Sequence, residues 1–125
     1  MEGNQVMDRR PRLLIVYFNS VYAVHCSRFF RRRGWDVHLA ASSAEACQMI
    51  AVLDPTAVVV DGELPCADAS ELCERITREH PGLTVVMATP DDVDASHRAP
   101  TPVVAVPRRQ GIEGLAEHLS GVGCA

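Results

Sequence analysis

The chain has 125 residues, of which 47% are hydrophobic and 22% charged, so it has the size of one domain and can bury a core. Its formal net charge of -4 excludes a broad basic field for nucleic acid, and no run approaches the roughly 20 apolar residues of a membrane helix. From the polar residues at its start we also expect no signal peptide. We therefore expect a cytoplasmic protein with a flexible lead-in over 1–11, a single domain over 12–120 and a tail over 121–125.

All twelve basic residues are arginines, and the cysteines are odd in number with no C-x-x-C spacing. This pattern argues against a zinc site or a disulfide framework and favours a reducing compartment. Three cysteines fall within apolar helical patterns, where we expect small core residues. The five cysteines are Cys26, Cys47, Cys66, Cys73 and Cys124.

Five short apolar segments predict the strands of a parallel sheet. The runs at 13–18, 57–60 and 83–88 are rich in β-branched residues and almost free of polar ones, which is typical of strands covered on both faces. The segment 35–40 alternates more and is expected nearer the sheet edge. The segment 102–106 begins with proline, which a strand tolerates as its first residue.

Helical patterns fill the gaps between these strands. We expect helices at 20–33, ended by Gly34, at 43–53, capped by Ser42 or Ser43, and at 70–80 and 111–119. The segment between Pro90 and Pro100 leaves room for only about two helical turns. Regular alternation predicts an α/β fold: a flavodoxin-like, doubly wound, five-stranded parallel sheet of order 2-1-3-4-5 with helices on both faces.

In such a sheet the functional groups lie outside the carboxyl ends of the strands. Asp61 is the most informative residue there, because it ends the uninterrupted apolar run of the third strand. A carboxylate at that place is a ligand, a nucleophile or a cap for the turn that follows. The other segments at this edge are 17–19, 61–64, 89–92 and 108–109.

Several stretches resemble one known family. VVVDGELP is similar to the phospho-acceptor segment of response-regulator receiver domains, in which an apolar strand is followed by Asp and, four residues on, by Pro. DASELCERITREHPGLTVVMAT resembles that family's third helix and fourth strand, and GWDVHLAASSAEACQMI its second strand and second helix. The likeness covers Arg12 to Leu119. It implies two-component signal transduction, in which the aspartate receives a phosphoryl group.

The resemblance implies that Asp61 is the phospho-acceptor and that Thr89 is the hydroxyl residue that contacts the phosphoryl group. The family's Mg²⁺-binding acidic pair is replaced here by Tyr17 and Phe18, which are poor ligands for a hard cation. We also expect these two aromatic side chains beside Asp61, where they would make its site more apolar. The family's lysine position falls on Arg108, which keeps the positive charge with a different geometry.

Replacement carboxylates for a metal are few. Glu63, Asp91 and Asp92 are weak candidates, and Asn19 offers only a neutral amide oxygen. We therefore expect no cofactor, with Mg²⁺ only if these residues restore its site. Arg108 and Arg109 are open to a second interpretation, as a solvated pair that does not meet Asp61.

Three functions remain open. The first is a stand-alone, atypical receiver domain that is not an enzyme, has impaired Mg²⁺-dependent phosphorylation, and acts mainly by binding a protein, such as a sensor histidine kinase or a downstream effector. The second is a working response regulator phosphorylated on Asp61. The third is a small flavin- or nucleotide-binding protein, although no glycine-rich loop follows the first strand. No nucleic-acid or membrane partner is expected.

Two further features bear on partners. Arg28 and 31–33 lie at the end of the first predicted helix, where cations complement the helix dipole; the other interpretation is a docking patch for an acidic partner. The family's switch uses an aromatic residue on the fifth strand, and the matching position here falls near Ala105. A phosphorylation-driven switch is therefore not expected to work in the usual way.

Overall fold

The computed structural model of the chain describes residues 10–62, 66–89, 103–107 and 110–120, and for 66–68 only the backbone. This part contains five strands and four helices, which alternate along the chain except between the fourth and fifth strands. The elements are β1 (Arg12–Val16), α1 (Ser20–Arg32), β2 (Asp36–Ala40), α2 (Ser43–Leu53), β3 (Ala57–Asp61), α3 (Cys66–Glu79), β4 (Thr84–Thr89), β5 (Val104–Pro107) and α4 (Gly111–Leu119).

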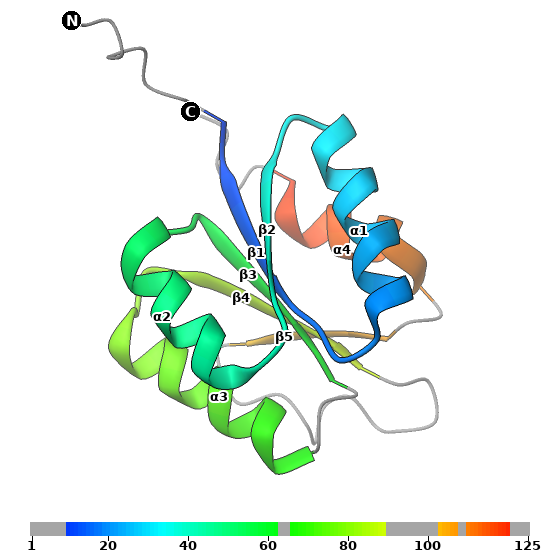
Figure 1. The fold of residues 1–125 in the computed structure, drawn as a ribbon. Coiled ribbons are helices and arrows are strands. Elements are labelled where there is room, and N and C mark those ends of the chain that lie inside the picture. Colours follow the sequence, from blue (N-terminus) through cyan, green and yellow to red (C-terminus); the bar gives the residue numbers. More distant parts are fainter. Residues whose placement is uncertain (1–9, 63–65, 90–102, 108–109, 121–125) are drawn as a thin grey trace, which may run out of the picture.

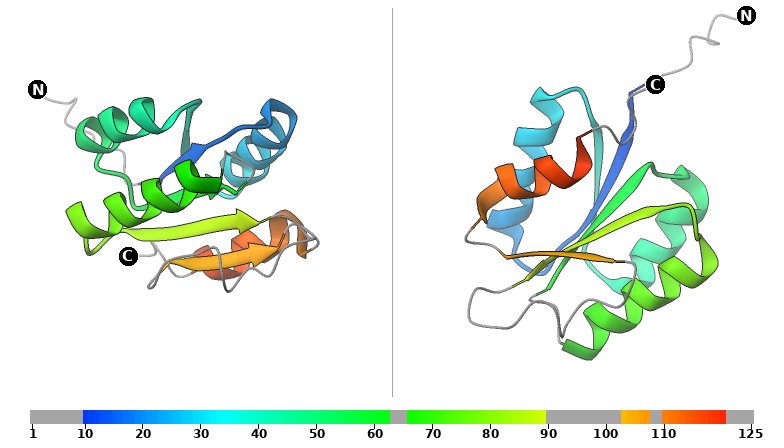
Figure 2. Two further views of the ribbon diagram at one scale, coloured as in Figure 1. Left: turned by 90° about the horizontal axis from the view of Figure 1, so that it is seen from below. Right: turned by 180° about the vertical axis from the view of Figure 1, so that it is seen from behind.

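The five strands form one parallel sheet in the order β2-β1-β3-β4-β5, which confirms the predicted topology. Figure 1 shows α1 and α4 on one face of this sheet and α2 and α3 on the other. β2 lies at one edge, as its alternating sequence predicted, and the right-hand view of Figure 2 shows β5 at the opposite edge. The fold is therefore a doubly wound, flavodoxin-like sheet.

Two apolar layers hold the helices to the sheet. Strand residues alternate between the faces, so Leu14 and Val16 pack toward α2 and α3, while Leu13 and Ile15 pack toward α1 and α4. All four side chains are almost completely buried. The central strands are apolar on both faces because both faces are covered, which explains their uninterrupted apolar sequence.

Local signals in the sequence set the ends of the first two helices. Gly34 follows the end of α1 with a φ of +95°, a conformation that favours glycine. Ser42 caps α2, since its Oγ accepts a hydrogen bond from the Glu45 amide at 3.1 Å. The Glu45 Oε1 in turn accepts one from the Ala41 amide at 2.7 Å, which makes a variant of the capping box with the amide one residue before the cap.

Several boundaries differ from those expected. β1 ends at Val16 and not at Phe18, although the Tyr17 amide still donates to the Ala40 carbonyl of β2 at 2.9 Å. α3 begins at Cys66, four residues before the predicted start at Ser70, in a stretch where alanines favour the helix. The expected short helix between 90 and 100 and the proline at 102 lie outside the described residues.

Three cysteines have described side chains, of which Cys26 and Cys73 are buried while Cys47 is partly exposed. Burial, with a smaller effect of the Glu74 carboxylate, raises the pKa of the Cys73 thiol to about 12. Such a thiol is a core residue and not a nucleophile. Among the described helices, none is long and apolar enough to cross a membrane.

Candidate functional site at the carboxyl edge of the sheet

Asp61 and Thr89 are the last residues of β3 and β4 and lie at the same edge of the sheet. The two strands are parallel neighbours, and their register pairs Asp61 with Ala88, so Thr89 extends one residue further. Asp61 continues the row of Val59 on the α1/α4 face, whereas Thr89 continues the row of Met87 on the α2/α3 face. The fold thus brings the two predicted residues to one edge but onto different faces of the strands.

The Asp61 carboxylate is buried and ties down the loop after β1. Its side chain is 1% exposed, and its Oδ2 accepts hydrogen bonds from the backbone amides of Phe18, at 3.0 Å, and Asn19, at 3.2 Å. These amides stand at the start of α1, where the helix dipole favours a negative charge. Bonds to a carboxylate are also stronger than neutral ones. Asp61 therefore has a structural role in the loop after β1, which differs from the cap of the following turn that was considered from its sequence position.

Asn19 is held by the helix that follows it. Its side-chain Oδ1 accepts hydrogen bonds from the amides of Val21, at 3.0 Å, and Tyr22, at 3.1 Å, which makes Asn19 the N-cap of α1. The amide oxygen that was considered as a metal ligand is thus engaged with the backbone. The sequence analysis did not predict this cap, although asparagine directly before a helical pattern is its usual signal.

The side chains of the two residues at the positions of the family's acidic pair lie in different surroundings. Tyr17 is half-buried and packs against the apolar layer beneath α1 and α4, whereas the Phe18 side chain is 61% exposed. The expectation that two rings would surround Asp61 and make its site apolar is therefore wrong for Phe18. What Phe18 provides to the carboxylate is its backbone amide.

Thr89 is completely buried, and among the described residues its Oγ1 has no hydrogen-bond partner. It does not bond to Asp61 in this structure. A buried hydroxyl without a partner is uncommon and costs stability, so its presence at this edge calls for an explanation.

Gly62 is a site residue that the sequence analysis missed. Its amide donates to the Ala88 carbonyl at 2.7 Å, and a Cβ on Gly62 would lie 2.6 Å from that oxygen and 3.2 Å from the Thr89 Cα. No side chain fits there without a shift of the backbone. The glycine directly after the strand-ending aspartate was the available signal, but only the register of β3 with β4 shows why it is needed.

The described residues at this edge do not fit a Mg²⁺ ion. Asp61 is the only carboxylate among them, one of its oxygens binds two amides, and the Asn19 oxygen caps a helix. No group of three His, Cys, Asp or Glu side chains in the described part of the chain could hold a metal. The weak candidates Glu63, Asp91 and Asp92, and the arginines Arg108 and Arg109, lie outside the described residues.

Known structures share this architecture over almost the whole chain. A protein assigned as a response regulator from Chloroflexus aurantiacus is 24% identical, with a TM-score of 0.78 over 93% of this chain and 99% of that one. The signal receiver domain of an HD domain-containing protein from Pseudomonas fluorescens is 21% identical, with a TM-score of 0.76 over 90% and 94%. The non-phosphorylated HemR receiver domain from Leptospira biflexa is 20% identical, with a TM-score of 0.75 over 93% and 96%.

No family sequence model matches the chain. At these identities the likeness establishes the fold, and function has to be argued from the site. The sheet order, the placement of the helices and the structural neighbours agree: this chain has the fold of response-regulator receiver domains.

Proposed function

We propose that this protein is an atypical receiver domain in two-component signalling that acts by binding other proteins, with metal-dependent phosphorylation of Asp61 impaired. The observation that carries the proposal is the pair of hydrogen bonds from the Phe18 and Asn19 amides to Asp61 Oδ2. They connect the expected acceptor to the loop in which the resemblance places the acidic pair. A carboxylate used to fix this loop is poorly placed to attack a phosphoryl donor.

The electrostatics of phosphoryl transfer support the same proposal. That chemistry depends on positioning and on neutralising negative charge, and a carboxylate that approaches phosphoryl oxygens without a divalent ion meets groups of its own sign. Losing one electrostatic donor in an enzyme typically costs roughly 10²–10³ in rate. The described residues contain no group of three His, Cys, Asp or Glu side chains that could hold such an ion. We therefore expect a loss at least that large relative to a receiver with an intact acidic pair.

One observation favours the second candidate, a response regulator that accepts phosphate on Asp61. Thr89 has a buried hydroxyl with no partner among the described residues, at the place where the resemblance puts the phosphoryl-binding hydroxyl. A phosphoryl oxygen could supply the missing partner. In that case Glu63, Asp91 or Asp92 would have to provide metal ligands and Arg108 the positive charge.

The two candidates separate in one experiment. The protein is incubated with acetyl phosphate and millimolar Mg²⁺, and labelling is followed by intact mass; beryllofluoride with Mg²⁺ is titrated in parallel by two-dimensional NMR. We expect no saturable response from the natural chain. A saturable, Mg²⁺-dependent response that disappears in Asp61→Asn would overturn the impairment and establish the second candidate.

A gain-of-function variant keeps the negative result informative. The double variant Tyr17→Asp/Phe18→Asp restores two carboxylates at the family's acidic positions, and we expect it to acquire Mg²⁺-dependent labelling at Asp61. The matched control, Tyr17→Asn/Phe18→Asn, makes the same positions polar without charge and should remain inert. If the acidic double variant folds and also stays inert, the missing pair is not the reason for impairment.

The setting and the partner are proposals of the same kind. The buried thiol of Cys73 is consistent with a reducing, cytoplasmic compartment. The partner class that follows from a receiver fold is a sensor histidine kinase or a downstream effector.

A further inference from the structure

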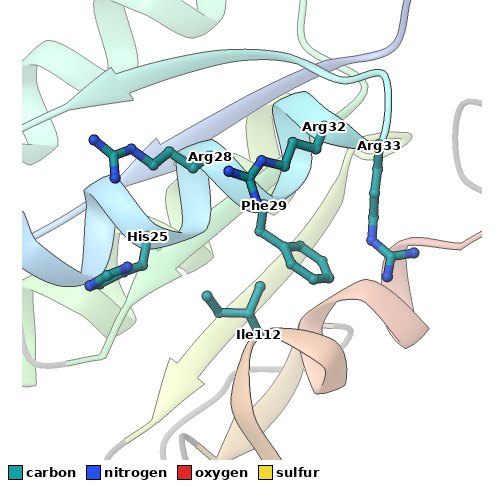
Figure 3. A pocket seen from close by; sticks show the side chains of 6 residues that line it. All are labelled: His25, Arg28, Phe29, Arg32, Arg33 and Ile112. Atoms are coloured by element: carbon teal, nitrogen blue, oxygen red, sulfur yellow. The ribbon is translucent and has the colours of Figure 1, made fainter.

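A basic pocket lies between α1 and α4, far from Asp61. It has a volume of about 600 Å³ and is lined by His25, Arg28, Phe29, Arg32, Arg33 and Ile112. Five of these six residues come from α1 and its C-cap, and Figure 3 shows Phe29 pointing toward Ile112 of α4 with the basic side chains around them. At 1.5 Å per residue, Arg33 lies roughly 20 Å along the helix from Asn19, which contacts Asp61. We refer to these six residues as the α1/α4 basic pocket.

The spacing of the basic residues places them on one stripe of the helix. Positions 25, 28, 29, 32 and 33 are three or four apart, so their side chains lie above one another over a length of about 12 Å. The stripe carries three guanidinium groups on a chain whose net charge is -4. This concentration of positive charge is local and does not reflect the protein as a whole.

These arginines have no carboxylate partner within the described part of the chain. Other arginines do have partners: Arg12 donates to the Leu53 carbonyl at 2.7 Å, Arg31 donates to the Val37 carbonyl at 3.2 Å, and Arg75 pairs with Glu79 at 3.3 Å. By contrast, no described residue forms a salt bridge with Arg28, Arg32 or Arg33, and the described lining of the pocket includes no acidic side chain. Complementing the helix dipole explains a charge in the last turn, but Arg28 stands a full turn earlier.

The acidic residue that adjoins the pocket in the sequence of the facing helix does not line it. Glu113 adjoins Ile112, yet its Oε1 lies 3.1 Å from the position that a Cβ on Gly111 would occupy, so it folds back against the start of α4. Glu113 is also absent from the described lining. The pocket therefore presents its positive charge to solvent.

The floor of the pocket is apolar and partly rigid. Phe29 and Ile112 are half-buried and pack against the apolar layer between the sheet and α1 and α4. The Arg33 guanidinium lies over the Phe29 ring, 4.4 Å from its centroid, and Phe30 meets the same ring edge-to-face at 5.2 Å. Arginine and aromatic side chains around an apolar centre are typical of the energetically dominant part of a protein interface.

We infer that the α1/α4 basic pocket is a docking site for an acidic, amphipathic segment of a partner protein, one that places an apolar side chain over Phe29 and Ile112 and carboxylates against Arg28, Arg32 and Arg33. The inference rests on the proposed function only in taking a protein as the partner. The apolar floor distinguishes such a segment from a bare phosphate, which has only charge to offer around the edge of the pocket. A nucleotide base is less suited, because Arg33 already covers one face of the Phe29 ring.

The test uses a synthetic peptide whose glutamates and leucines fall on one face of a helix, labelled with fluorescein. Binding is measured by anisotropy, and its place on the protein by NMR shifts of the arginine side chains. We expect saturable binding at or below about 1 mM, with shifts centred on Arg28 and Arg32. A peptide of identical composition with the leucines moved to the opposite face should bind at least about tenfold more weakly, because its apolar group cannot reach Phe29.

Matched variants separate docking from general attraction of charge. Arg28→Gln/Arg32→Gln should raise the dissociation constant at least roughly tenfold, since two charge-assisted contacts are lost. Arg75→Gln/Arg78→Gln removes the same amount of charge from α3. It should change the dissociation constant less than about threefold, as expected for distant charges screened by salt. Asp61→Asn should leave binding unchanged, so a failure here is distinguishable from a failure of the phosphorylation experiment.

Three results would overturn the inference. The first is an absence of saturable binding by the peptide at millimolar concentration, and the second is equal weakening by the α1 and α3 double variants. The third is tighter, Arg28-dependent binding of ADP, an oligonucleotide or phosphatidylglycerol vesicles than of the peptide. In that last case the pocket exists, but its ligand is a phosphate compound and not a protein.

Discussion

The two ends of α1 differ in the sign and the burial of the charged groups beside them. At its N-terminus the Asp61 carboxylate is buried and bonded to the amides of Phe18 and Asn19, so a group suited to chemistry is used to hold a loop. At its C-terminal half, Arg28 and Arg32 are exposed and have no acidic partner among the described residues. Within the described residues, the helix therefore has a buried carboxylate bonded to backbone amides at one end and guanidinium groups that face solvent near the other.

The largest expected effect concerns Gly62, which brings the ends of β3 and β4 together. Gly62→Ala forces a methyl group to within 2.6 Å of the Ala88 carbonyl oxygen, and we expect a loss of about 2–3 kcal/mol from overpacking and a weakened hydrogen bond. Urea unfolding, followed by the fluorescence of the buried Trp35, measures this loss in the free energy of unfolding. The matched control is Gly82→Ala, where a Cβ meets nothing within 4 Å and the change should stay within about 0.5 kcal/mol. Equal effects at both glycines would contradict the close approach.

Substitutions of Asp61 should give the second largest change in the free energy of unfolding. The sign of that change tests the structural role of Asp61. Asp61→Ala leaves the amides of Phe18 and Asn19 without their acceptor, and we expect a loss of about 1–3 kcal/mol. Asp61→Asn keeps an acceptor oxygen but loses the charge, so its loss should be smaller. In a site crowded with carboxylates, removing one charge would relieve repulsion and stabilise the protein. A gain in the free energy of unfolding for Asp61→Asn would thus indicate such crowding. It would contradict the structural role of Asp61 at the N-terminus of α1.

The fold could be predicted because its signals are local. The apolar runs that became β1, β3 and β4 are uninterrupted as the coverage of both faces requires, and Ser42 with Glu45 marks the start of α2 through a variant of the capping box visible in four residues. Boundaries were less predictable. Alanines before Ser70 extend α3 back to Cys66, because their helix propensity is high.

The site was predicted in position but not in its contacts. The end of an apolar run places Asp61 at the carboxyl edge, yet its partners are backbone amides, which every residue type provides and no sequence pattern marks. The need for Gly62 depends on the register of two strands more than twenty residues apart in the sequence. Phe18 was expected beside the carboxylate because only its ring was considered. The end of β1 at Val16 turns that ring into solvent.

Buried hydroxyls without partners give smaller effects of the opposite sign. Thr89→Val should leave the free energy of unfolding unchanged or raise it by about 1 kcal/mol, since an apolar group of the same shape replaces an unsatisfied one. Ser27→Ala within α1 is the matched test, because the Ser27 Oγ is also buried and unpartnered among the described residues. A loss at Thr89 alone would show that its hydroxyl has a partner in solution, and would strengthen the phosphate-accepting alternative.

The smallest expected change in the free energy of unfolding compares the two helices directly. The same substitution, arginine to glutamine, is expected to stabilise the protein on α1 and to destabilise it on α3. Arg28 and Arg32 are like charges one turn apart on α1, so Arg28→Gln should stabilise the protein by about 0.2–0.5 kcal/mol at low salt. Arg75 is spaced in the same way from Glu79 on α3, at 3.3 Å, so Arg75→Gln should destabilise it by a similar amount, about 0.3–0.5 kcal/mol. Both changes should shrink in high salt, because exposed charges are screened. Unfolding of the two variants at low and high salt measures the difference. If Arg28→Gln is destabilising and insensitive to salt, Arg28 already has a partner within the chain and is not held free for a ligand.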